Sequence, residues 1–294
     1  MKFLEKHPMF MIVIGILGIS LSAIFVKYSD APSAVTAAFR LLWTAGLMTP
    51  VVFGRAEVRR ELFGLKPGLV LLSALSGVFL AIHFVTWFDS LRHTTVASST
   101  TIVCTEVIWV ALGYCLILKG KLSRKAVAAI GVTLLGSILI AWSDSGSGTQ
   151  LHGDLLALVT AVAVGIYTLI GRVVRSEAST TVYTYLVYTA CAAVLVVTCF
   201  VQGYGLFDYG LSAVIVGLLL SVFSTFLGHS IFSWCLKYFS PSLVSASKLC
   251  EPVVAAILAA FLFAEVPGPA QLLGGILILG GVFYYSGIER KGQA

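Results

Sequence analysis

The chain has 294 residues, of which 59% are hydrophobic and only 11% are charged, and its mean hydropathy is +1.00. A soluble protein of average composition carries about 25% charged residues, so this chain lacks the polar surface that a soluble domain of its length needs. The formal net charge of +6 does not indicate nucleic acid as a partner, because the basic residues gather in short breaks between apolar stretches. We therefore expect an all-α polytopic membrane protein whose partner is the lipid bilayer.

Apolar stretches of membrane-spanning length follow one another along the whole chain. A bilayer core about 30 Å thick is crossed by about 20 apolar residues in a helix. By this measure the sequence predicts ten transmembrane helices, at residues 9–27, 33–53, 67–91, 95–118, 126–142, 154–171, 180–201, 211–236, 242–263 and 270–287. The first stretch follows a short basic start and resembles a signal peptide, but no clear cleavage site follows it, so we expect a retained helix.

The distribution of Lys and Arg predicts the orientation of these spans. If the N-terminus is cytoplasmic, 15 of the 19 basic residues fall in cytoplasmic segments, as the positive-inside rule requires. The outside segments then hold only Lys27 and Arg92, while Arg40 and Lys248 lie within spans. Nine or eleven spans would spoil this partition. We therefore predict ten spans in the cell membrane, with both termini in the cytoplasm.

The two halves of the chain resemble each other. Residues 102–107 in span four resemble residues 247–252 in span nine, and this alignment places Glu106 opposite Glu251, 145 residues later. Because five spans are an odd number, the second copy would enter the membrane from the opposite side. That arrangement is an inverted repeat, which places a substrate site near the middle of the membrane between the copies. We predict one repeat in residues 1–146 and the other in residues 147–294.

At these residues the chain resembles the drug/metabolite transporter superfamily, in its EamA-type ten-helix branch. The matching features are the duplication, the run from Glu251 to Ala256, the segment from Gly153 to Leu158 that opens span six, and Arg40 in span two. The resemblance implies two EamA-type repeats around a central cavity, and the export or exchange of metabolites such as amino acids or related compounds. Val107 departs from the pattern, since the family usually has a proline there.

Glu106 and Glu251 are the first candidates for the substrate site. A charged side chain at the centre of a membrane helix costs about 2.5–3.5 kcal/mol, so it usually faces a cavity or a partner. The two acids could bind a cationic or zwitterionic substrate or take up a proton, or they could form structural ion pairs. Lys248 lies three residues before Glu251 and is expected to share its helix face and neutralise it, leaving Glu106 without a local partner.

Arg40 and Pro252 are the next candidates. Arg40 could pair with Glu106, bind a substrate carboxylate through its two-pronged guanidinium, or extend to the membrane surface. Pro252 removes a backbone donor directly after Glu251, so we expect it to kink span nine and act as a hinge.

Histidines and aromatic rings complete the predicted site. His83 and His229 could relay protons or simply pack between helices. Trp87 and Tyr167 could wall a cavity and hold a substrate ammonium by cation–π contact, or belong to ordinary helix packing.

Several kinds of function lack their motifs in this sequence. No GxxxxGK[ST] loop is present, and neither the cysteines nor the histidines show metal-binding spacing. We expect no cofactor, no metal and no enzymatic activity; the alternatives left open are an intramembrane enzyme and a channel-like facilitator. Proton coupling is a further alternative. A homodimer is only weakly supported, because the glycines of spans five and ten do not form GxxxG motifs.

Overall fold

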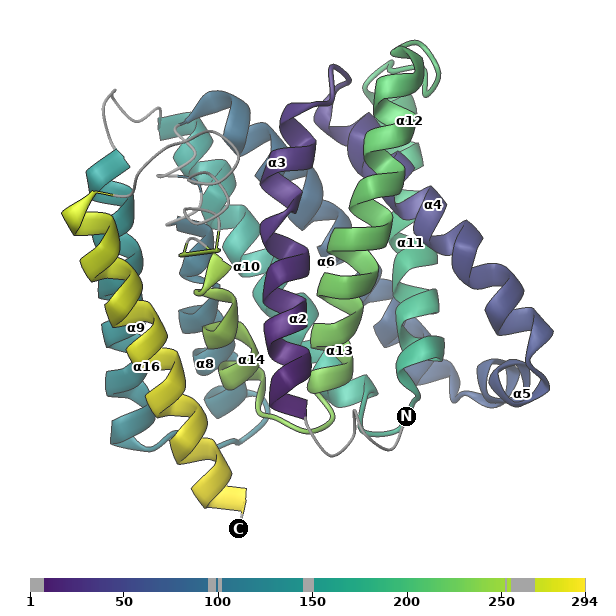
Figure 1. The fold of residues 1–294 in the computed structure, drawn as a ribbon. Helices are drawn as coiled ribbons and strands as arrows, with labels where there is room; N and C mark the ends of the chain where they lie inside the picture. The colour runs from purple at the N-terminus through teal and green to yellow at the C-terminus, as the bar shows by residue number, and fades with distance from the viewer. Residues whose placement is uncertain are drawn as a thin grey trace.

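The computed structural model describes residues 8–94, 99, 102–144, 151–251, 253–254 and 268–293, and the regular structure in these segments is helical. The helices run side by side as a bundle, with α9 and α16 at one edge and α4 and α5 at the opposite edge (Figure 1). In chain order they are α2 (Pro8–Ser20), α3 (Ser22–Lys27), α4 (Ser33–Gly54), α5 (Ala56–Gly64), α6 (Pro67–His93), α8 (Glu106–Leu116), α9 (Arg124–Asp144), α10 (Leu151–Val174), α11 (Thr180–Val201), α12 (Gly210–Leu219), the π-helix η1 (Leu220–Ser230), α13 (Ile231–Cys235), α14 (Pro241–Lys248) and α16 (Pro269–Gln293).

Within the described residues, six helices are long and apolar enough to cross a membrane. They are Pro8–Val26, Ser33–Gly54, Pro67–His93, Leu151–Val174, Thr180–Val201 and Gly210–Cys235. The predicted all-α membrane fold is confirmed at this level. The count of ten spans stays a prediction, because the predicted spans 95–118 and 242–263 lie partly outside the described residues.

Local sequence signals explain where several helices begin. The side chain of Ser179 accepts a hydrogen bond from the backbone of Val182, and Ser240 caps α14 in the same way. Such N-caps satisfy one of the free N–H groups of the first turn. Pro67 and Pro241 occupy the first turns of α6 and α14, where the missing proline N–H costs nothing.

Packing joins the two halves of the chain closely. The most extensive contacts between helices pair α6 with α10 and α11, α4 with α11 and α12, α2 with η1, α8 with α10 and α14, and α9 with α16. Each pair combines a helix from residues 1–146 with one from residues 147–294. The predicted repeats therefore interlock, and a cavity between them is lined from both. The boundary between the repeats stays a prediction.

Gly77 permits one of these close approaches. A β-carbon added at Gly77 of α6 would lie 2.5 Å from the carbonyl oxygen of Val187 and 2.8 Å from the β-carbon of Ala190, both on α11. No flexible side-chain end is available to move away. Gly46 in α4 is a natural contrast, because nothing lies within 4 Å of an added β-carbon there.

We predict that Gly77→Ala lowers the melting temperature of the detergent-solubilised protein, while Gly46→Ala leaves it unchanged or slightly higher. The first substitution overpacks the α6–α11 contact, at a cost of about 1–3 kcal/mol. Unfolding followed by tryptophan fluorescence measures both. A Gly77→Ala protein as stable as the parent would show that α6 and α11 do not approach this closely.

Candidate functional site

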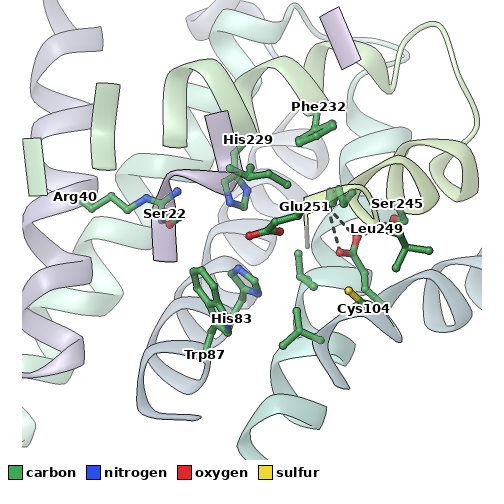
Figure 2. A pocket seen from close by; sticks show the side chains of 15 residues that line it. Ser22, Arg40, His83, Trp87, Cys104, His229, Phe232, Ser245, Leu249 and Glu251 are labelled. Atoms are coloured by element: carbon green, nitrogen blue, oxygen red, sulfur yellow. Dashed lines mark hydrogen bonds and ion pairs between the residues drawn. The ribbon is translucent and has the colours of Figure 1, made fainter. Parts of the chain in front are cut away.

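A cavity of about 690 Å³, counted with the open space at its mouth, lies between the two halves of the bundle. Its walls come from α2, α3, α4, α6, α8, α10, η1, α13 and α14, together with residues next to α8 and α14. Figure 2 shows Arg40, His83, Trp87, His229 and Glu251 among the side chains that line it. Glu106 and Lys248 line it too, so the cavity brings together seven of the eight residues predicted to bind substrate.

The carboxylate of Glu106 is held by three side chains from other helices. Lys248 Nζ lies 2.9 Å from Oε1 and 3.2 Å from Oε2, forming an ion pair with little exposure to solvent. Ser245 and Thr168 donate hydroxyl hydrogen bonds to Oε1 at 2.8 and 3.2 Å. The pair connects α8 to α14, and Thr168 adds α10.

Helix irregularities precede both acids. A turn at Thr105 separates residues 102–104 from α8, which begins at Glu106. Around it Thr105 N–H donates to Ile102 O and Ile108 N–H donates to Thr105 O. The same two hydrogen bonds recur 145 residues later, from Cys250 to Ser247 and from Val253 to Cys250. Just before each acid, a backbone N–H therefore donates to the carbonyl three residues earlier rather than four, which tightens the helix locally.

This irregularity corrects the predicted partner of Lys248. The sequence places Lys248 and Glu251 three residues apart, which would put them on one face of an unbroken helix. The turn at Leu249 and Cys250 ends α14 between them. Lys248 therefore pairs with Glu106, which does not lack a partner. Pro252, the predicted hinge, lies outside the described residues.

Arg40 is buried and does not extend to the membrane surface. It does not pair with Glu106 either, because the ion-pair partner of Glu106 in the described part of the chain is Lys248. Its Nε donates to Thr225 at 2.8 Å and its Nη1 donates to Ser22 at 3.3 Å. The ring of Phe84 lies 4.2 Å from its Cζ, within cation–π distance. Nη2 is buried and has no hydrogen-bond partner among the described residues. Among the described residues the guanidinium is therefore held by neutral groups, and its Nη2 has no acceptor.

The histidines and aromatic rings form one wall of the cavity. The rings of His83 and Trp87 are stacked with centroids 6.1 Å apart, and those of His83 and His229 lie 6.0 Å apart. His83 Nδ1 is another buried nitrogen without a hydrogen-bond partner in the described part of the chain. Tyr167 is not among the lining residues: its ring lies 6.0 Å from that of His229, and its hydroxyl is hydrogen-bonded to Ser233. Tyr167 thus packs against the lining residue His229 without lining the cavity itself.

Sequence reasoning missed the neutral residues that hold these charges. Ser22 and Thr225 fix Arg40, Phe84 lies against its guanidinium, and Thr168 reaches Glu106. Small hydroxyls are common in membrane helices, so nothing marks these residues in the sequence. Thr225 also lies in the π-helix η1, where side chains do not follow the α-helical period that a sequence pattern assumes.

Comparisons with known proteins agree on the class of protein. Residues 151–287 match the EamA-like transporter family. A protein from Archaeoglobus fulgidus named uncharacterized transporter is 23% identical over 214 residues, which cover 71% of this chain and 73% of that protein. Another protein of that name, from Clostridium kluyveri, is 22% identical over 252 residues, covering 83% of this chain and 80% of its own.

A crystal structure of another protein shares the fold. It superposes with a TM-score of 0.78 and covers 98% of this chain and 99% of its own, at 17% sequence identity. At this identity the likeness concerns the fold alone. Together with the apolar helices, the family match identifies a multi-pass membrane transporter.

We predict that Lys248→Met destabilises the protein by about 3–5 kcal/mol, because it leaves the buried Glu106 carboxylate without its counter-charge. The double variant Glu106→Gln/Lys248→Met should recover most of this loss, since no buried charge is left alone. Melting temperatures in detergent measure both.

Lys66→Met provides the control. Lys66 forms an ion pair with Glu177 at 2.7 Å, but both side chains are largely exposed. The neighbouring carboxylate raises the pKa of Lys66, and water screens the pair, so its loss should hardly change stability. Equal effects of Lys248→Met and Lys66→Met would contradict a stabilising role of the buried pair.

Proposed function

Because the chain belongs to the drug/metabolite transporter superfamily, we propose that it is a secondary transporter of a small zwitterionic metabolite, such as an amino acid. It works by alternating access around the cavity described above and acts as an exporter or exchanger. It resides in the cell membrane with both termini in the cytoplasm.

The charges that line the cavity support a zwitterionic substrate. Within the part of the chain that the structure describes, the ion pairs are Lys66–Glu177 and Lys248–Glu106, so neither Arg40 nor Glu251 belongs to one. Arg40 presents the unpartnered Nη2, and the Glu251 side chain enters the same cavity (Figure 2). A substrate carboxylate suits the guanidinium, and a substrate ammonium suits Glu251 and the face of Trp87.

The symmetry of the packing supports alternating access between inverted repeats. The exchange of spans one to five with spans six to ten replaces α2 by α10, α4 by α11, and α6 by the segment of α12 and η1. The contact of α6 with α10 then corresponds to that of η1 with α2, and the contact of α6 with α11 corresponds to that of α4 with α12 and η1. In three further contacts the two helices simply change places, so each contact corresponds to itself: α4–α11, α8–α14 and α9–α16. The recurring hydrogen bonds before Glu106 and Glu251 obey the same exchange. Transporters of this design place irregular helices and their substrate at the interface of the repeats.

We predict saturable uptake of at least one α-amino acid from a radiolabelled panel into proteoliposomes, stimulated by the same compound inside the vesicles. The corresponding amines, which lack the carboxylate, should compete poorly. Open-pore conductance would instead indicate a channel, and chemical conversion of the substrate would indicate an enzyme.

In the same assay Arg40→Met should weaken the apparent affinity for the amino acid about 10- to 100-fold, since a hydrogen bond to a charged group contributes about 1.5–3 kcal/mol. Lys66→Met, at an exposed pair outside the cavity lining, serves as the control. Unchanged affinity in a folded Arg40→Met protein would remove Arg40 from the substrate site.

We predict the orientation from two exposed positions at opposite ends of the bundle. Gln202 follows α11 and Arg60 lies in α5, and both side chains are exposed. A membrane-impermeant maleimide should label Gln202→Cys in intact cells, but Arg60→Cys only after the cells are permeabilised. The parent protein gives the background from its own cysteines. Labelling of Arg60→Cys in intact cells would reverse the orientation.

A further inference from the structure

The environment of the Lys248 ammonium is that of a ligand in a binding site. Nζ contacts both oxygens of Glu106, at 2.9 and 3.2 Å, and lies 5.6 Å from the centre of the Phe232 ring. A carboxylate and an aromatic face are the two groups that bind an organic ammonium. Ser245 and Thr168 hold the carboxylate in place. Glu106, Ser245, Phe232 and Lys248 all line the cavity, so this group of residues is open to it.

The corresponding acid has no such occupant. Glu251 aligns with Glu106 in the repeat and follows the same irregular hydrogen bonds, yet it takes part in no ion pair within the described residues. The residue that aligns with Lys248 in span four is Val103, which has no charge. Among the described residues, the chain therefore supplies an ammonium to Glu106 and none to Glu251.

We propose that Glu106 and Phe232 form an ammonium-binding subsite of the cavity, and that Lys248 fills it permanently as a tethered ligand. A tethered group has an effective concentration in the millimolar range or above, so free amines and coupling cations do not displace it. The proposal of this subsite does not depend on the protein being a transporter. The consequence for the substrate rests on the proposed function: its ammonium is directed to Glu251, and any coupling proton is carried there rather than by Glu106.

The test empties the subsite and offers it a free ligand. Lys248→Ala removes the ammonium and three methylene groups, which together equal propylammonium. The purified variant should melt well below the parent protein, and propylammonium chloride should restore at least half of the lost melting temperature with a saturable dose dependence. Tetramethylammonium chloride at equal ionic strength has no N–H donor and should restore nothing.

Two matched proteins complete the experiment. The double variant Glu106→Gln/Lys248→Ala lacks the carboxylate and should show no response to propylammonium. The parent protein should not respond either, because Lys248 already occupies the subsite. A Lys248→Ala protein that melts identically with and without propylammonium would overturn the proposal, and so would a parent protein that propylammonium stabilises equally.

Purification of Lys248→Ala in propylammonium throughout keeps the test decisive if the variant is too unstable without it. Loss of the folded protein on removal of the amine supports the proposal, and a variant that does not fold even in the amine contradicts it. These measurements use no transport substrate. A failed rescue therefore leaves the proposed transport function standing, and absent transport leaves the subsite standing.

Discussion

The buried ion pair between Glu106 and Lys248 is the interaction on which the centre of this protein depends. A lone charge in the middle of a membrane protein is costly, so each member of the pair requires the other. The pair obliges α8 and α14 to stay together, although they lie far apart in the chain. Thr168 of α10 and Ser245 complete the carboxylate's hydrogen bonds. One electrostatic requirement thus fixes the meeting point of the two halves and places it on the cavity wall.

Irregular backbone gathers around this point. The turns before Glu106 and Glu251 interrupt their helices, and the π-helix η1 carries Thr225 and His229. Inside a membrane, such backbone is tolerated only where protein or a cavity surrounds it. The irregularities also direct the side chains: the turn after Lys248 separates it from Glu251, and η1 allows Thr225 to reach Arg40. The segments that depart from regular helix are therefore those that build the site.

The sequence predicted the helical class and the charged and imidazole residues of the cavity lining for one physical reason. Charged and imidazole side chains within apolar spans are expensive, and they gather where a cavity or a partner relieves the cost. Arg40, Glu106 and Glu251 stand out for this reason. The pairing was wrong because the periodicity rule for Lys248 and Glu251 assumes an unbroken helix, whereas α14 ends at Lys248. The kink expected from Pro252 was not applied to this preceding turn. Neutral groups such as Thr225 carry no such cost, so this argument cannot identify them from the sequence.

The charge balance of the cavity bears on the alternating access proposed above, in which the protein moves in both a loaded and an empty state. One cavity is lined by Arg40, Lys248, Glu106 and Glu251, so the formal charges of these four residues cancel without a substrate. A zwitterion adds no net charge and brings opposite charges to the two groups outside the internal ion pair, Arg40 and Glu251. Neither state then leaves an uncompensated charge in the middle of the membrane, where a lone charge is costly. In that proposal the internal pair has a direct role, because Lys248 offsets Glu106, the acid that the proposed substrate does not bind.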